Sequence, residues 1–190
     1  MGKIYATIDN KLASWLSDQK IFFVATAPLS PSGHINCSPK DGASFRILNE
    51  QTVAYLDLIG SGVETIAHLK ENGRIVLMFC AMEGPPKIVR LHGHGEAIEP
   101  KHPDYESLRA AFQDLPGLRA FIRIRLTRIS DSCGFGVPVY QFRGERSQLK
   151  EWVKRKGEPS LAAYRQEKNS KLYQNPEAAP LSHQLQHPLR

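Results

Sequence analysis

Hydrophobic and polar residues alternate with a period of two along much of the first 130 residues, which is the pattern of β-strands with one buried face. The clearest example is Phe-Ile-Arg-Ile-Arg-Leu-Thr-Arg at 121–128, where the arginines at 123 and 125 share one face and the isoleucines share the other. Pro39 is expected to end the second strand. Strands are predicted at 20–27, 34–38, 44–48, 52–58, 74–82, 87–98 and 121–129.

Helical periodicity interrupts this pattern in three places. After Asp9, a candidate N-cap, Leu12 and Leu16 fall on one helix face. A second helix is predicted at 63–71, and the chain becomes polar and helical past Glu145. Many short strands, few helices and turns rich in Gly and Pro indicate a mainly β (α+β) fold, either an antiparallel barrel or a sandwich.

The charge pattern divides the chain into two parts. The net charge is +6, but residues 1–140 carry 15 basic and 14 acidic side chains, whereas residues 141–190 carry 10 and 5. We therefore expect one domain over 1–140 and a helical extension over 141–190, ending in a flexible tail. Acidic residues interrupt the bases of the extension, and its only tight basic cluster, Lys154-Arg155-Lys156, has no interleaved aromatic residues for stacking. A solvated helix is therefore favoured over a nucleic-acid surface.

Composition excludes several other classes. The three cysteines form no Cys-x-x-Cys pair, so a zinc ribbon or a thioredoxin-type site is not supported. No apolar run reaches the roughly 18–20 residues of a membrane span. The first residues lack the apolar core of a secretion signal, which predicts a cytoplasmic protein with reduced thiols and no membrane partner.

Two segments carry candidate ligand-binding chemistry. Residues 55–65 leave a strand, pass Gly60 and Gly62, and enter a helix whose N-terminus would favour an anion such as phosphate. The alternative is a capping box, in which Ser61 and Glu64 satisfy the free N–H groups themselves. Residues 36–42 close a hairpin strand and carry Lys40, a point charge suited to phosphate or to a flavin carbonyl. An ordinary turn is the alternative there.

A third segment, His92-Gly-His94-Gly-Glu96, would place two imidazoles and a carboxylate on one strand face. This arrangement is similar to the metal site of cupins. The cupin glutamate stands further downstream, however, and no companion histidine is evident on a later strand. A cupin-like metal enzyme is therefore the weakest alternative, and no metal ligand is assigned.

Taken in order, several motifs resemble the pyridoxamine 5′-phosphate oxidase-related family of FMN-binding split barrels. They are Ser38-Pro39-Lys40, Phe45-Arg46-Ile47-Leu48, Ala54-Tyr55-Leu56-Asp57, Gly60-Ser61-Gly62, His68-Leu69-Lys70-Glu71-Asn72-Gly73-Arg74-Ile75 and Leu77-Met78-Phe79. The resemblance covers about residues 10–140 and implies a six-stranded antiparallel split β-barrel of Greek-key type. It also implies a homodimer with FMN in a cleft between the subunits.

The resemblance also implies cofactor contacts. The isoalloxazine would lie beside Asn36, Cys37, Ser38, Pro39 and Lys40. The ribityl chain and phosphate would lie beside Asp57, Leu58, Ser61, Gly62, Glu64, Thr65 and Arg90.

One departure concerns the helix start, where many relatives place two basic residues and this chain has Glu64. An acid there would repel a phosphate dianion, so a deazaflavin is the alternative cofactor. The expected function is an FMN-dependent oxidoreductase that acts on a small molecule. The alternative is a flavin-binding or regulatory dimer without turnover.

Overall fold

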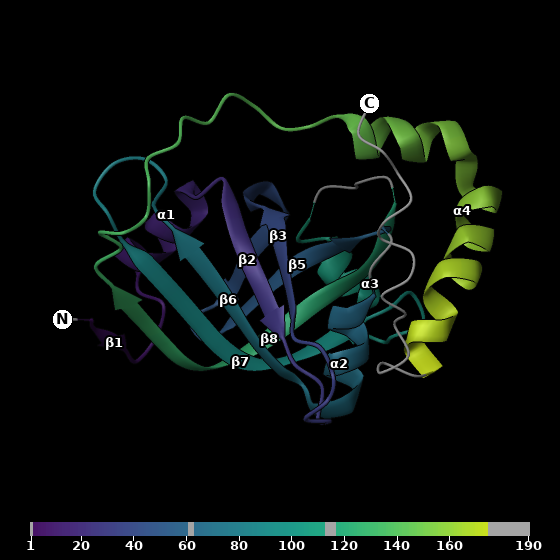
Figure 1. Ribbon diagram of the computed structural model, residues 1–190, viewed down its shortest axis with the longest axis horizontal. Helices are drawn as coiled ribbons and strands as arrows, with labels where there is room; N and C mark the ends of the chain where they lie inside the picture. The colour runs from purple at the N-terminus through teal and green to yellow at the C-terminus, as the bar shows by residue number, and fades with distance from the viewer. Residues whose placement is uncertain (1, 61–62, 113–116, 175–190) are drawn as a thin grey trace.

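The computed structural model describes residues 2–60, 63–112 and 117–174, and its dominant feature is one curved antiparallel sheet flanked by helices (Figure 1). The strands are β1 (Ile4–Tyr5), β2 (Ile21–Thr26), β3 (Asn36–Asp41), β4 (Phe45–Asn49), β5 (Thr52–Leu58), β6 (Arg74–Cys80), β7 (Ile88–Ile98) and β8 (Leu118–Ser132). The helices are α1 (Asn10–Asp18), α2 (Glu64–Asn72), α3 (Tyr105–Arg109) and α4 (Gln148–Gln174), with a 3₁₀ turn at Gly42–Ser44.

The strands follow the order β3-β2-β6-β7-β8-β5-β4, and β1 pairs with β8. After the β6–β7 hairpin, β8 returns beside β5, which is a Greek-key connection. The predicted split barrel is therefore confirmed. All seven strands indicated by the hydrophobic pattern are present among the described residues, so the six strands implied by the resemblance are too few. The sequence pattern missed β1 and the short helix α3.

The edge strand β3 differs from its prediction in length. It continues through Pro39 to Asp41, and Pro39 is the register partner of Phe23 on β2. Proline removes one backbone donor, so a central strand tolerates it poorly. Since β3 has β2 as its only described strand partner, the missing N–H of Pro39 can face the open edge without breaking a ladder.

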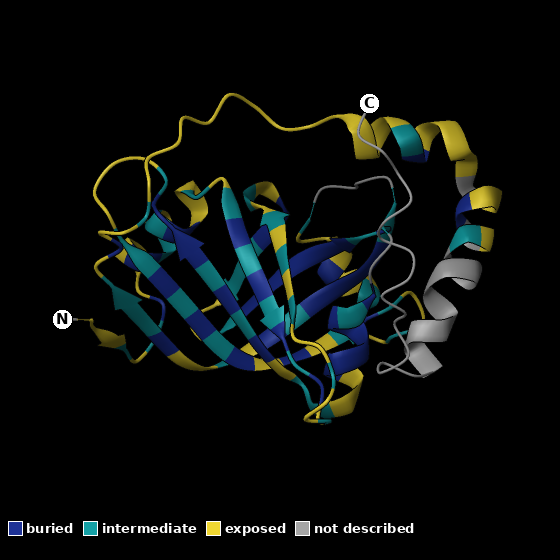
Figure 2. Ribbon diagram, in the orientation of Figure 1, coloured by how far each residue is buried: buried dark blue, intermediate teal, exposed yellow. Residues whose placement is uncertain are grey.

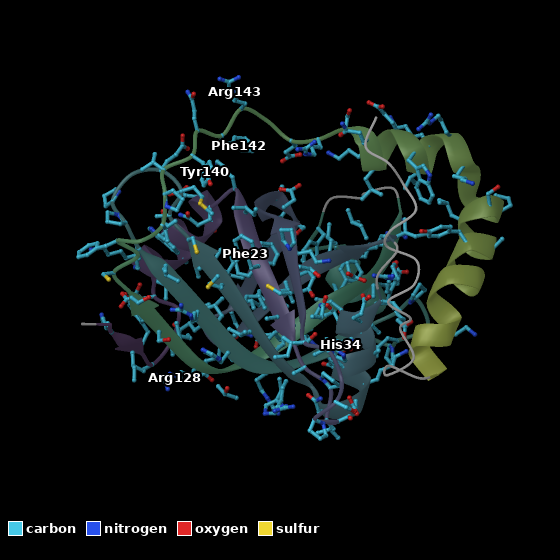
Figure 3. All side chains as sticks on the ribbon, viewed as in Figure 1. Phe23, His34, Arg128, Tyr140, Phe142 and Arg143 are labelled. Atoms are coloured by element: carbon cyan, nitrogen blue, oxygen red, sulfur yellow. The ribbon has the colours of Figure 1, made fainter. Side chains whose placement is uncertain are left out.

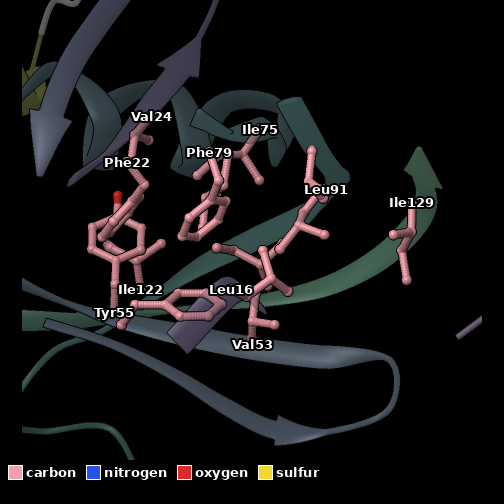
Figure 4. Packing of buried hydrophobic residues seen from close by; sticks show 14 of the residues in the cluster. Leu16, Phe22, Val24, Val53, Tyr55, Ile75, Phe79, Leu91, Ile122 and Ile129 are labelled. Atoms are coloured by element: carbon pink, nitrogen blue, oxygen red, sulfur yellow. The ribbon is translucent and has the colours of Figure 1, made fainter. Parts of the chain in front are cut away.

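The core fills the concave side of the sheet. Burial alternates residue by residue along β2, as Figure 2 shows. Phe22 on β2 stacks on Phe79 at 5.2 Å between ring centroids and meets Tyr55 edge-on at 5.6 Å. The Asp9 side chain caps α1, as predicted. Leu12 and Leu16 of this helix are almost fully buried in the same cluster, in which Figure 4 labels Leu16. Burial of these large side chains is the main source of stability of the barrel.

The C-terminal extension leaves the barrel after β8. A segment that we call the arm, residues 134–147, crosses above the ends of β2 and β6 before α4 begins (Figure 1). Helix α4 bends at Gly157, and its Val153 and Leu161 pack on Ile59, just beyond β5. The predicted tail lies largely outside the described residues. Within the described residues, no helix combines the length and apolarity that crossing a bilayer requires.

Candidate functional site

A cavity of about 340 Å³ lies where the edge strand β3, the end of β5 and the start of α2 meet. The two segments singled out in the sequence, 36–42 and 55–65, thus lie together in space, although residues 43–54 separate them along the chain. Seven of the predicted site residues line this cavity, together with Gly60 and Arg119: Asn36, Ser38, Lys40, Asp57, Leu58, Glu64 and Thr65.

The alternation of β3 decides which of its residues reach the cavity. Asn36, Ser38 and Lys40 are half-buried and share the face that carries the inward side chains of β2. Cys37 and Pro39 lie on the opposite, exposed face. The sequence segment therefore contributes every second residue to the site, as the period of a strand requires.

Hydrogen bonds connect β3 to the first turn of α2. The Asn36 side-chain amide donates to the Thr65 hydroxyl at 2.9 Å, and the Ser38 hydroxyl donates to the Asn36 side-chain oxygen at 3.1 Å. The two walls of the cavity are therefore linked by side chains and not only by packing.

The bounds of α2 do not fit the capping box that was the alternative interpretation of residues 55–65. The helix begins at Glu64 with Val63 as its N-cap, and among the described residues no side chain caps it. Ser61, its expected partner in the capping box, and Gly62 lie outside the described residues. Because a capping box needs its glutamate three residues after the cap, a helix starting at Glu64 cannot form one. Within the part of the chain that the structure describes, no cap side chain therefore competes with a ligand for the N–H groups of this turn.

A buried ion-pair network forms the base of the cavity. The Asp57 side chain is 1% exposed, and it accepts a hydrogen bond from Arg119 Nε at 2.7 Å. Lys40 Nζ approaches the other carboxylate oxygen at 3.4 Å. Two cations surround the Asp57 carboxylate, and Glu64 is a second acid in the lining, so the charged side chains of the cavity balance. An anionic ligand would therefore depend on the N–H groups at the start of α2.

Arg119 is the site residue that the sequence pattern missed. It stands at the start of β8, two residues before the strand predicted at 121–129, and so was not assigned to any element. The register pairs Asp57 with Ala120, the residue after Arg119. A buried acid near the end of a strand, such as Asp57, indicates that a cation must lie nearby. Which cation this is depends on the pairing of β5 with β8.

Tyr55 lies beneath this network. Its ring is fully buried, and Lys40 Nζ lies 5.9 Å from the ring centroid. Burial is the largest cause that raises the pKa of the Tyr55 phenol, followed by the Asp57 charge, while Arg119 and Thr65 act to lower it. The phenol therefore stays protonated at neutral pH and adds no negative charge below the cavity.

Arg90 lies elsewhere. It belongs to β7, two strands away from β2, and its guanidinium donates to the Ser132 hydroxyl at 3.1 Å. It does not line the cavity described above.

The His92–Glu96 segment lies on β7 as expected, but a β-bulge between His92 and Gly93 shifts its register. Glu96 pairs with Arg123, with 2.6 Å between its carboxylate and the guanidinium. Among the described residues, no group of three His, Cys, Asp or Glu side chains is placed to hold a metal ion. The carboxylate of the motif that resembled a metal site in sequence is thus held by Arg123.

The fold and the cavity define a class of protein: a split β-barrel with a polar pocket between an edge strand and a helix start. Comparison with protein families places the chain within that class. The family model for pyridoxamine 5′-phosphate oxidase matches residues 8–133. The chain therefore belongs to the pyridoxamine 5′-phosphate oxidase family.

Individual relatives agree with this assignment. The chain is 42% identical over 143 residues to the pyridoxamine 5′-phosphate oxidase family protein ustO of Aspergillus flavus; the match covers 73% of this chain and 57% of that protein. It thus spans just over half the length of that relative.

Among solved structures, a variant of HupZ from Group A Streptococcus has a TM-score of 0.52 at 22% identity, over 66% of this chain and 99% of that one. A candidate pyridoxamine 5′-phosphate oxidase from Lactobacillus delbrueckii has a TM-score of 0.51 at 14% identity, over 67% and 98%. These structural likenesses show a shared fold.

Proposed function

We propose that this protein is an FMN-dependent oxidoreductase that acts on a small molecule, and that it works as a homodimer. The observation that carries the proposal is the meeting of Lys40, the Asp57–Arg119 pair and the uncapped start of α2 around one cavity of a family barrel. These groups suit the two ends of a flavin mononucleotide, which are a ring that gains negative charge on reduction and a phosphate.

Specific residues are suited to hold each end. The N–H groups of the first turn of α2 and the Thr65 hydroxyl would bind the phosphate, because an uncapped helix start favours an anion. Lys40 would face the ring, and its ion pair with Asp57 orients the ammonium group. Glu64 in the same turn opposes a phosphate dianion, so the helix dipole and the cations must outweigh one acid.

A bound flavin would supply the hydride or electron transfer, and the protein needs to orient it and stabilise charge on it. Lys40, which its ion pair with Asp57 orients, meets that need without a side-chain nucleophile. Arg119 and Asp57 would be positioning residues: Asp57 pairs with Lys40, and Arg119 in turn holds Asp57.

The size of the cavity supports a second subunit. Its volume of about 340 Å³ is near the lower end of the range of about 300–1,000 Å³ typical of small-molecule sites. A flavin mononucleotide held there would extend beyond the cavity. A second copy of the chain is the partner we propose to cover the exposed part.

Pyridoxamine phosphate is not the substrate we expect. Binding of its phosphate would need a dedicated set of basic residues. In this sequence, Arg123 comes nearest to such a residue. That guanidinium is held by Glu96 at 2.6 Å and by Asp104 at 2.8 Å, and it lies outside the cavity. Steady peroxide release from the FMN-loaded protein with this substrate would refute the expectation.

The test of the proposed function is identification of the flavin. The protein purified after expression with excess riboflavin is denatured, and the released chromophore is separated and counted against protein. We expect FMN at about one per chain. Release of FAD or a deazaflavin would refute the choice of cofactor, and a protein that neither carries nor takes up any flavin would refute the proposal.

A further inference from the structure

A second, larger cavity of about 1310 Å³ lies beneath the arm. The barrel supplies one wall and the arm the other, as Figure 3 shows for Tyr140 and Phe142 above the strand ends. The arm is fixed at its middle, where the Tyr140 N–H donates to the Met82 carbonyl at 2.9 Å. Apolar side chains line much of the space: Trp15, Ile21, Leu58, Tyr140, Phe142 and Leu149. We call this space the arm chamber.

The arm chamber adjoins the proposed cofactor site. Lys40 and Leu58 line both cavities, so a molecule in the chamber would meet whatever occupies the smaller one. The arm itself follows the region that the family model matches, which ends at residue 133. One wall of the chamber is therefore a feature of this chain beyond the shared barrel.

The charges of the chamber indicate an uncharged occupant. Six basic and five acidic side chains line it, so the two signs nearly balance. Lys87 lies 3.9 Å from Asp131, and Lys40 lies 3.4 Å from Asp57. On the arm side, Lys150 lies 3.6 Å from Glu145. This balance gives a phosphorylated or strongly anionic molecule no net electrostatic attraction to the chamber.

We propose that the arm chamber binds an uncharged, largely apolar aromatic or conjugated molecule, and that Tyr140 and Phe142 of the arm determine which molecule fits. The claim that the chamber is the substrate site next to a flavin rests on the proposed function. The claim that the chamber binds such a molecule can be tested separately. The volume of the chamber is above the range of about 300–1,000 Å³ for drug-sized ligands, so the occupant can be larger than a single small ring.

The test uses Nile red, a neutral conjugated dye, titrated into the full-length protein and followed by its fluorescence. We expect saturable binding that Phe142→Ser weakens by at least about fivefold, because an apolar contact is lost. Phe135→Ser is the matched control: Phe135 lies on the same arm, is 82% exposed and does not line the chamber. Its variant should bind the dye like the parent.

Equal affinity of the parent and Phe142→Ser, or equal losses in both variants, would overturn the proposal. Displacement of the dye by pyridoxamine phosphate would overturn its uncharged class. Flavin content, measured on the same samples, separates the two claims. If the dye binds as predicted but the protein takes up no flavin, the proposed function is refuted and the proposal of a binding site in the arm chamber stands. Full flavin content with dye binding insensitive to Phe142 would refute the chamber alone.

Discussion

The cofactor cavity and the arm are built in opposite ways. The cavity is closed by groups from distant parts of the chain, and a buried carboxylate with two cations fixes their positions. The arm is local in sequence, is tied to the barrel by a backbone hydrogen bond at Tyr140, and exposes large apolar side chains such as Phe135 and Val139. In our proposal, the rigid cavity holds the cofactor and the adaptable arm selects the substrate.

The largest expected effect of a substitution is at Asp57. Asp57→Ala would leave Arg119 buried without its carboxylate, which should lower the free energy of unfolding by about 3–5 kcal/mol. Chemical denaturation measures this, with Glu50→Ala, an exposed acid, as the control. If both variants lost less than about 1 kcal/mol, the network would not be the rigid element of the site.

The second effect separates binding from stability. Lys40→Ala should weaken FMN binding by about ten- to a hundredfold, since a charge-assisted contact contributes about 1.5–3 kcal/mol. Its effect on unfolding should stay near 1 kcal/mol or below, because the Lys40 side chain is 23% exposed. Arg90→Ala, which removes a cation outside the cavity, is the control for titrations with FMN. Equal losses in the two variants would contradict the placement of the site.

A smaller effect concerns pH and the helix that borders the cavity. His68 of α2 is buried, with its Nδ1 3.0 Å from the Thr26 hydroxyl, and burial is the main cause that lowers its pKa below the usual 6.5. The folded state thus binds fewer protons than the unfolded chain. The contribution of His68 to stability is complete above about pH 6.5 and is lost as the pH falls below it.

His68→Asn keeps a group that can bond Thr26 and removes the titration. Denaturation at several pH values should show a flatter loss of stability on acidification than in the parent. Identical pH profiles would show that His68 is not held neutral by the fold.

The smallest effect is expected on the arm. Phe142→Ser should change the free energy of unfolding by less than about 0.5 kcal/mol, because the side chain is 45% exposed. A loss comparable to that of Asp57→Ala would mean that the arm is part of the core and not an adaptable wall.

The sequence predicted the barrel better than it predicted the pocket. Alternation identified the seven main strands, because each buries one face and so keeps a period of two. Pro39 misled the prediction of β3, since proline ends central strands but is tolerated at an edge. The two-residue strand β1 carries too few positions for any period to be visible.

The site was predicted in part. Lys40 and Asp57 were identified as separate candidates, but their contact and the role of Arg119 depend on strand pairing, which a single sequence does not specify. Arg90 is the opposite case, a residue that was predicted to be in the site but does not line the cavity. It has the right charge for a phosphate site, yet it lies on a strand that the sheet order keeps apart from β3.

The most direct measurement is a crystal structure of the protein with FMN bound. The account predicts the phosphate within hydrogen-bond distance of the first turn of α2 and the ring beside Lys40 on β3. FMN bound at any other place, or no bound FMN in crystals grown with saturating cofactor, would contradict it.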